Sequence, residues 1–291
     1  MDSLILAPLA AALAILAINA YFGLHVIRRG VIFVDLAFAQ VAALGGTVAM
    51  LLGAESGSLT SIGATFLFTL LGALIFSFTR LEDSNVPQEA IIGITYVVAS
   101  AAVILLASFS AEGAEHVSET LTGSLIWVTW PTVGRIVAVY VLIGLFHYAL
   151  RRRMLDITFR PENVRRIRLW DFVFYVTFGI AITFSVNLAG VLLIFSTLVI
   201  PATIAFLFVD RFGAALIIAW ATGALAIIGG LATSFSLDIV TGPVLVCSFG
   251  LVLILAALLR AVRGGGAGTG AGDDRMPAKD RPSPDTMPVG G

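Results

Sequence analysis

Long apolar runs are the feature that most limits how this chain can fold. One run covers residues 190–209 without a charged side chain and ends at Asp210 and Arg211. A helix needs about 20 consecutive apolar residues to cross the hydrocarbon core of a bilayer. Similar runs cover residues 4–27, 31–53, 59–79, 90–109, 130–150, 172–187, 212–235 and 239–259. The sequence therefore predicts an all-α, polytopic membrane helix bundle of about nine transmembrane helices, or of eight if the short run 172–187 does not span.

The composition of the chain agrees with a membrane location. Hydrophobic residues make up 59% of the chain and charged residues 12%, whereas about a quarter of the residues of a soluble domain are charged. The single cysteine, Cys247, excludes both a disulfide framework and a cysteine metal site. We expect a multi-pass protein of the cell inner (plasma) membrane that contacts membrane lipid and no nucleic acid.

The basic residues are distributed unequally among the loops between the predicted helices. When the runs cross the membrane alternately, all 17 Lys and Arg residues except Arg135 belong to one set of loops or to the C-terminal segment attached to it. Because basic loops remain in the cytoplasm, the N-terminus is predicted outside and the C-terminus in the cytoplasm. Residues 1–263 then form the transmembrane domain, and the Gly- and Pro-rich residues 264–291 form a disordered cytoplasmic tail.

The second run carries polar side chains that packing alone does not require. Small residues recur at helical spacing after Asp35, and Gln40 and Thr47 lie beside them. A face of small and polar side chains inside a membrane must contact another helix or water. Asp35, Gln40 and Thr47 are therefore candidates for a transport path or a metal contact, and close helix packing is the alternative explanation of the small residues.

An acidic segment precedes Trp127 on the predicted outer side. Its members Glu115, His116 and Glu119 are spaced so that two of them would share one face of a helix. Carboxylate and imidazole groups suit a divalent cation, which makes this segment a candidate outer entrance for a metal ion. A solvated acidic loop is the simpler alternative.

The chain lacks the pattern that cradles the phosphates of a nucleotide. No G-x-x-x-x-G-K-[ST] sequence occurs, and the only lysine is Lys279 in the C-terminal segment. We therefore expect this chain to be a transport subunit without enzymatic activity and without a cofactor of its own. If ATP drives the transport, a partner subunit binds and hydrolyses it.

The run at residues 190–209 has two features that would allow another protein to move it. Pro201 has no N–H to donate to the carbonyl of Thr197, so a helix bend is predicted there. The short polar turn at residues 210–213 follows at once and leads into another apolar run. An external protein that binds the tight turn could therefore move the bent helix next to it.

Four segments resemble segments of the zinc/manganese/iron permease family of ABC transporters. The first is GVLLIFSTLVIPATIAFLF, which is similar to an apolar run of the family that ends in Leu/Ile-Pro-Ala-Ala/Thr. The second is LDIVTGPVLV, which is similar to Asp-x-Pro-Thr-Gly-Pro at the last span of the family, with Val240 in place of the first proline. The others are EAIIGITYVVAS and LTGSLIWVTW. Their order and spacing make the resemblance specific, and it extends over nearly all of residues 1–263.

This resemblance implies that residues 1–263 are the permease domain of an ATP-driven ABC importer for a divalent metal cation, zinc or manganese first. Such a permease forms a homodimer, binds cytoplasmic ABC ATPase subunits and receives the metal from an extracytoplasmic metal-binding protein. The resemblance also implies a segment that couples the chain to the ATPase, made of Phe208, Asp210, Arg211 and Phe212.

The second run departs from the family pattern in one position. Relatives commonly carry a histidine one turn after the aspartate, whereas this chain has Ala39 there, with Gln40 beside it. The loss of an imidazole removes a good zinc ligand, so the sequence leaves the identity of the metal open.

Three other functions remain as alternatives. An ABC permease for an iron chelate or cobalamin would need a wider path than the small residues indicate. A secondary carrier driven by an ion gradient would need acidic residues near the middle of the bilayer, where Asp35 is the only candidate. An intramembrane enzyme would need a catalytic cluster at one depth, and the sequence predicts none.

Overall fold

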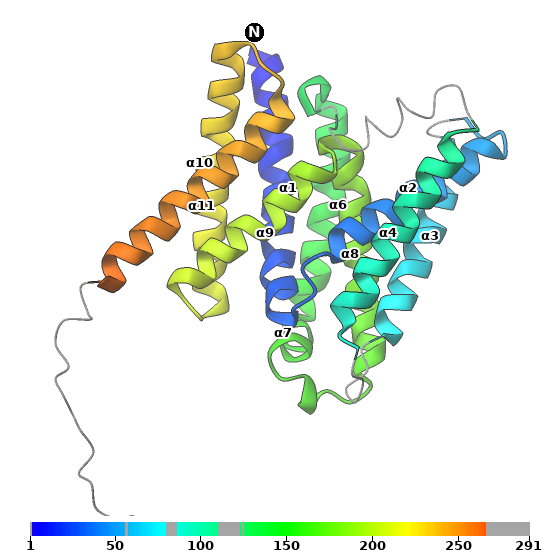
Figure 1. Cartoon of the computed structure of the whole chain (residues 1–291), viewed down its shortest axis with the longest axis horizontal. Helices are drawn as coiled ribbons and strands as arrows, with labels where there is room; N and C mark the ends of the chain where they lie inside the picture. Colours follow the sequence, from blue (N-terminus) through cyan, green and yellow to red (C-terminus); the bar gives the residue numbers. More distant parts are fainter. Residues whose placement is uncertain (1, 56–57, 80–85, 110–122, 124, 266–291) are drawn as a thin grey trace, which may run out of the picture.

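The computed structural model of the chain describes residues 2–55, 58–79, 86–109, 123 and 125–265. These residues form helices, and no strand occurs among them. The elements shown in Figure 1 are α1 (Asp2–Arg29), α2 (Val34–Leu51), α3 (Leu59–Phe78), α4 (Gln88–Ala107), η1 (Leu125–Trp127), α6 (Trp130–Ala149), α7 (Arg151–Phe159), η2 (Pro161–Asn163), α8 (Ile167–Ala189), α9 (Val191–Phe208), α10 (Phe212–Leu237) and α11 (Thr241–Gly265).

Within the described part of the chain, nine helices are long and apolar enough to cross a membrane, and they include every α-helix except the short α7. The predicted all-α bundle of about nine transmembrane helices is thereby confirmed. The run 172–187 belongs to α8, which has 23 residues. The apolar run is shorter than the helix because Arg168 and Asp171, in the first two turns of α8, interrupt the apolar sequence. The predicted orientation of the termini remains a prediction.

Helix α1 lies in the middle of the bundle, between α10 and α6 (Figure 1). It packs against α9 and α10, and also against α6. Helix α11 packs on α9 and α10. These helices and α1 and α6 form one group, and α2, which packs against both α3 and α4, forms a second group with them. Helix α8 contacts members of both groups, including α1, α2, α3 and α9. Two groups of helices therefore meet along α8.

Aromatic rings fill the space where these groups meet. Phe22 of α1, Phe38 of α2, Phe76 of α3 and Phe178 of α8 are fully buried. The ring centroids of Phe38 and Phe76 lie 5.1 Å apart, as do those of Phe22 and Phe178, and both pairs meet edge to face. Such pairs contribute about 0.5–1.5 kcal/mol beyond their buried area. These contacts hold α8 against α1 and α2 against α3.

Glycines allow two pairs of helices to approach closely. A Cβ added to Gly23 of α1 would lie 1.9 Å from the carbonyl oxygen of Leu198 in α9. A Cβ added to Gly45 of α2 would lie 2.7 Å from the carbonyl oxygen of Ala64 in α3. Small residues permit such contacts between membrane helices. Part of the small-residue pattern of the second run therefore serves helix packing.

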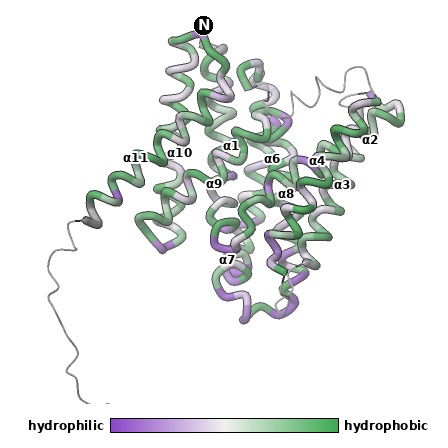
Figure 2. The backbone as a smooth tube through the Cα atoms, viewed as in Figure 1, coloured by the Kyte–Doolittle hydropathy of each residue, from purple (hydrophilic) through white to green (hydrophobic). Residues whose placement is uncertain are grey.

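Hydrophilic residues gather at the end of the bundle that carries α7, opposite the N-terminus (Figure 2). This end includes Arg28 and Arg29 at the end of α1 and the arginines at positions 151–153 in α7. Arg135 lies near the start of α6, away from α7. The distribution agrees with the two sets of loops inferred from the sequence.

Several predictions concern residues outside the described part of the chain. Glu115, His116 and Glu119 of the candidate outer entrance lie there, and so does residue range 266–291 of the expected tail. The outer entrance and the disordered tail therefore remain predictions.

Candidate functional site

The first turn of α2 holds a buried acidic side chain. Asp35 is 1% exposed, because α2 packs against α3, α4 and α8. Its Oδ1 atom has no hydrogen-bond partner among the described residues. A buried carboxylate without a partner is costly, and acidic residues within membrane helices mark ion and substrate pathways by default. Asp35 is therefore the strongest candidate for a cargo contact.

A second acidic side chain reaches the same helix end. Oε1 of Glu89, in the first turn of α4, accepts a hydrogen bond of 3.0 Å from the backbone N–H of Phe33. Phe33 is the residue that precedes α2, two positions before Asp35. Oε2 of Glu89 is buried and has no partner among the described residues. The junction of α2 and α4 thus holds two carboxylates, each with one oxygen that the described residues leave free.

Gln40 and Thr47 lie on a different face of α2. They are seven residues apart and share one side of the continuous helix, whereas Gln40 lies about 140° around the axis from Asp35. Gln40 is 7% exposed, and the buried hydroxyl of Thr47 donates to the carbonyl oxygen of Ala43 at 2.9 Å. The structure therefore does not bring Thr47 and Gln40 to the carboxylates, and their part in a path remains a prediction.

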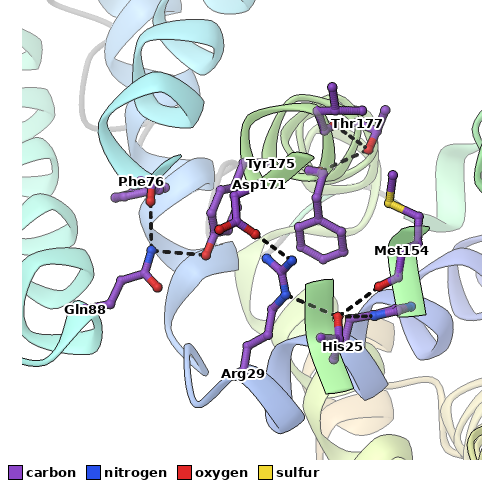
Figure 3. Close-up of polar contacts among 11 residues, drawn as sticks. His25, Arg29, Phe76, Gln88, Met154, Asp171, Tyr175 and Thr177 are labelled. Carbon is purple, nitrogen blue, oxygen red and sulfur yellow. Dashed lines mark hydrogen bonds and ion pairs between the residues drawn. The ribbon is translucent and has the colours of Figure 1, made fainter. Parts of the chain in front are cut away.

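A buried ion pair joins the end of α1 to the start of α8 (Figure 3). Nη2 of Arg29 lies 2.8 Å from Oδ1 of Asp171, and the two side chains are 4% and 0% exposed. The guanidinium carbon also lies 4.1 Å from the ring centroid of Phe174. Nε of Arg29 donates to the hydroxyl of Thr158 in α7 at 3.3 Å. One arginine therefore connects α1 with both α7 and α8.

Polar contacts continue from α8 to α3 and α4 (Figure 3). The side-chain amide of Gln88, the first residue of α4, donates to the hydroxyl of Tyr175 at 3.2 Å and to the carbonyl oxygen of Phe76 at 2.8 Å. Tyr175 lies one turn after Asp171 on α8, and its ring centroid is 5.6 Å from the Arg29 guanidinium carbon. A row of buried and partly buried polar groups therefore connects the end of α1 to the α4 end that carries Glu89.

The turn between α9 and α10 is exposed but tied to α1. Asp210 has a side chain that is 93% exposed, and its Oδ1 accepts a hydrogen bond of 2.9 Å from Nη2 of Arg28. The Arg28 guanidinium carbon lies 4.2 Å from the ring centroid of Phe206 in α9. Phe212, the first residue of α10, has its ring centroid 4.9 Å from that of His25. The segment Phe208–Phe212 is thus a short exposed turn held at both ends by one helical turn of α1.

Helix α9 is continuous across Pro201, from Val191 to Phe208. One turn before the proline, the hydroxyl of Thr197 accepts a hydrogen bond of 3.0 Å from the amide of Asn19 in α1. Together with the approach of Gly23 to Leu198, this contact fixes α9 against α1. The bend at Thr197 and Pro201 remains a prediction.

His25 of α1 and His147 of α6 are two buried histidines that lie against the same aromatic ring. Both rings meet the ring of Tyr21, with centroid distances of 4.8 and 5.4 Å. Nδ1 of His147 shares a hydrogen bond of 3.0 Å with the Tyr21 hydroxyl, and Nε2 shares one of 2.7 Å with the hydroxyl of Thr177. His147 is therefore a core histidine whose two nitrogens are both satisfied.

Two further acidic residues lie in helices long enough to span, close to where those helices begin: Glu89 in α4 and Asp171 in α8. That Asp35 is the only acidic candidate near the middle of the bilayer remains a prediction. Asp171 was missed because the apolar run was taken to start at the next residue, although Leu169 and Trp170 before it are apolar as well. Among the described residues, no group of three or more His, Cys, Asp or Glu side chains is arranged to hold a metal ion.

The fold is that of a multi-pass membrane protein. The chain belongs to the ABC 3 transport family, whose model matches residues 1–260. It is 24% identical over 249 residues to the manganese import system permease protein ScaB of Streptococcus parasanguinis, covering 84% of this chain and 86% of that protein. It is 25% identical over 195 residues to the chelated iron transport system membrane protein YfeC of Yersinia pestis, covering 66% of each.

Solved structures share the fold. PsaBC from Streptococcus pneumoniae in complex with Fab matches with a TM-score of 0.71 at 19% identity, over 86% of this chain and 90% of that one. A metal-chelate type ABC transporter in an inward-facing conformation matches with a TM-score of 0.62 at 21% identity, over 90% and 84%. The chain therefore shares the helix arrangement of these transporters.

Proposed function

We propose that this chain is the permease subunit of an ATP-driven importer for a divalent metal cation, with manganese as the first cargo to test and zinc as the second. Membership in the ABC 3 transport family supports the class of transporter. Two relatives named for manganese transport, from Streptococcus parasanguinis and Listeria monocytogenes, support the cargo.

The observation that carries the proposal is the pair of carboxylates at the junction of α2 and α4. Asp35 and Glu89 each keep a buried oxygen without a partner among the described residues. Carboxylates, carbonyls and water suit manganese, whereas imidazole suits zinc. Because Ala39 stands where relatives carry a histidine, oxygen ligands favour manganese here. Water, backbone carbonyls or a second copy of the chain would complete the coordination of a passing ion.

In this proposal, the ATPase acts on the permease at the turn between α9 and α10. A cytoplasmic ABC ATPase would dock on Phe208, Asp210, Arg211 and Phe212 and move this turn when it binds and hydrolyses ATP. Arg28 would transmit the movement to α1, and Arg29 would pass it to Asp171 of α8. The contact of Tyr175 with Gln88 then leads to α4, next to Glu89. The cargo junction and the docking turn are thus connected through polar contacts that can break and re-form.

The remaining parts of the proposal follow from the class of transporter. An extracytoplasmic metal-binding protein delivers the cation, two copies of the chain form the permease, and the complex resides in the cell inner (plasma) membrane. This chain itself hydrolyses no ATP and binds no cofactor. In this proposal the carboxylates line the inner half of the path, because the polar network lies at the end predicted to face the cytoplasm.

Iron is a further candidate cargo, because two relatives are named for chelated iron transport in Yersinia pestis. Iron as a bare divalent ion would use the same two carboxylates. Competition between free ions and chelates distinguishes the two forms.

Transport by the reconstituted complex tests the proposal. The full chain is placed in proteoliposomes with its ATPase subunit and metal-binding protein, and uptake of radiolabelled manganese, zinc and iron is measured with and without ATP. We expect ATP-dependent manganese uptake that falls by roughly tenfold or more in Asp35→Asn and in Glu89→Gln. The exposed Glu55 supplies the control Glu55→Gln, which should transport normally. Concentrative uptake by the chain without any ATPase would refute the ABC mechanism.

A further inference from the structure

A groove runs along α1 between α6 and α10 and is closed at one end by α7. Its volume is about 380 Å³. The floor comes from Ala17 and Tyr21 of α1, and the walls include Gly144 of α6 and Leu216 and Trp220 of α10. Figure 1 shows α1 between the two wall helices. Ligand pockets in proteins have volumes of about 300–1,000 Å³, so the groove can hold a ligand.

The groove lies between helices long enough to span a membrane, and the polar groups of Trp220, Tyr21 and His147 are paired within it. Tyr148 and Trp220 on its rim are 65% and 42% exposed. The indole N–H of Trp220 donates to the carbonyl oxygen of Ala17 at 3.1 Å, and the Tyr21 hydroxyl is paired with His147. What remains for a ligand is an apolar surface between two membrane-spanning helices. Hydrocarbon is the solvent at this depth of a bilayer.

The mouth of the groove carries an unneutralised positive charge. Arg151 is the first residue of α7, and its guanidinium carbon lies 4.7 Å from the ring centroid of Tyr148. The salt bridges among the described residues involve Arg28 and Arg29, and neither involves Arg151. Arg152 and Arg153 follow directly and are exposed as well. A ligand that suits the whole groove is therefore apolar along its length and anionic at the α7 end.

We propose that the groove binds an anionic phospholipid, with one acyl chain along α1 and the phosphate group on Arg151. Basic pockets between membrane helices bind anionic headgroups, and the cytoplasmic leaflet supplies such lipids. The lipid would contact α1, α6, α7 and α10 together. Phe212, which starts α10 next to the docking turn, also lines the groove. Bound lipid would therefore stabilise the position of the docking turn relative to α1.

Lipid retention by the full-length protein tests this assignment. The protein is purified in detergent, equilibrated with equal amounts of phosphatidylglycerol and phosphatidylcholine, and analysed by native mass spectrometry. We expect retention of phosphatidylglycerol over phosphatidylcholine by about fivefold, the factor given by about 1 kcal/mol per basic residue near the membrane surface. Arg151→Gln should remove the preference. Arg135→Gln, near the other end of α6, should keep it.

A second pair of variants tests the apolar part. A Cβ at Gly144 meets no atom within 4 Å, and the same is true of Gly134 two to three turns earlier on α6. Gly144→Leu should fill the groove and remove bound phosphatidylglycerol, whereas Gly134→Leu should retain it. Both variants must elute as monodisperse protein, so that a loss of lipid reflects the filled groove and not misfolding.

Three results would overturn the proposal. The first is equal retention of the two lipids by the wild type, and the second is unchanged phosphatidylglycerol binding by Gly144→Leu. The third is evidence that a second copy of the chain occupies the groove. In a Cys247→Ser background, Gly144→Cys would then form cross-linked dimers in the membrane, whereas lipid occupancy predicts no cross-link at this position.

Discussion

Arg28 and Arg29 are neighbours at the end of α1, yet their guanidinium groups bind carboxylates in different parts of the molecule. Arg28 binds Asp210 in the exposed turn between α9 and α10, and Arg29 binds Asp171 in the interior. The side chains of Arg28 and Asp210 are 34% and 93% exposed, whereas the second pair is almost completely buried. The two pairs should therefore respond differently to mutation.

Removal of one partner of the buried pair should destabilise the protein strongly. Asp171→Ala leaves the Arg29 charge buried, which costs about 3–5 kcal/mol. The double variant Arg29→Met with Asp171→Leu removes both charges and should be more stable than either single variant. Thermal unfolding in detergent, followed by circular dichroism, measures the difference. Equal stability of Asp171→Ala and the wild type would show that the ion pair does not form.

Removal of the exposed pair should affect transport more than stability. Asp210→Asn weakens a contact between solvent-accessible groups, and such ion pairs contribute little to folding. If the pair transmits movement of the docking turn to α1, Asp210→Asn should reduce ATP-driven uptake while the unfolding temperature stays nearly constant. The exchange of the two charges, Arg28→Asp with Asp210→Arg, should restore part of the uptake. Normal transport by Asp210→Asn would remove this pair from the coupling path.

The approach of α1 to α9 gives a stability prediction that is independent of function. Gly23→Ala places a methyl group 1.9 Å from the carbonyl oxygen of Leu198, and overpacking of this kind costs about 1–3 kcal/mol. Gly134→Ala adds the same methyl group where nothing lies within 4 Å. It should be neutral or slightly stabilising, because alanine is the better helix former. Thermal unfolding of the two variants in one detergent compares them, and equal values would contradict the tight contact.

Much of the fold could be predicted from the sequence because the bilayer imposes a simple rule. Apolar runs of about 20 residues must form helices there, and eight of the nine runs could be recognised by length alone. The α8 helix was underestimated because Arg168 and Asp171 interrupt its apolar start. A polar residue near a helix end looks like a loop residue until its partner on another helix is known, and Arg29 lies 142 positions away from Asp171.

The candidate site could be predicted only in part for the same reason. Asp35 stood out because a carboxylate occurs among small residues on one helix. Glu89 did not, because its position in the first turn of α4 suggests a role in its own helix, whereas its carboxylate binds the backbone of Phe33 before α2. Contacts between helices distant in sequence, such as Arg28 with Asp210, leave no periodic pattern. They depend on packing that a single sequence does not show.

The last prediction concerns the position where this chain departs from its relatives. Ala39 follows Asp35 by one helical turn, so Ala39→His would place an imidazole on the same face of α2 as the carboxylate. Imidazole suits zinc better than manganese. We therefore expect the ratio of zinc to manganese uptake to rise in Ala39→His, by roughly tenfold if the imidazole becomes a ligand.

The control for this prediction is Ala42→His, because Ala42 is also nearly buried, 5% exposed against 2% for Ala39. Its side chain would lie about 10 Å along the helix axis from Asp35, since each residue advances a helix by 1.5 Å. An imidazole there is too far away to share an ion with the carboxylate, although it imposes a similar cost of overpacking. A rise in the zinc ratio that is the same in both variants would reflect a general change of the bundle. A rise confined to Ala39→His would place the passing metal ion next to Asp35.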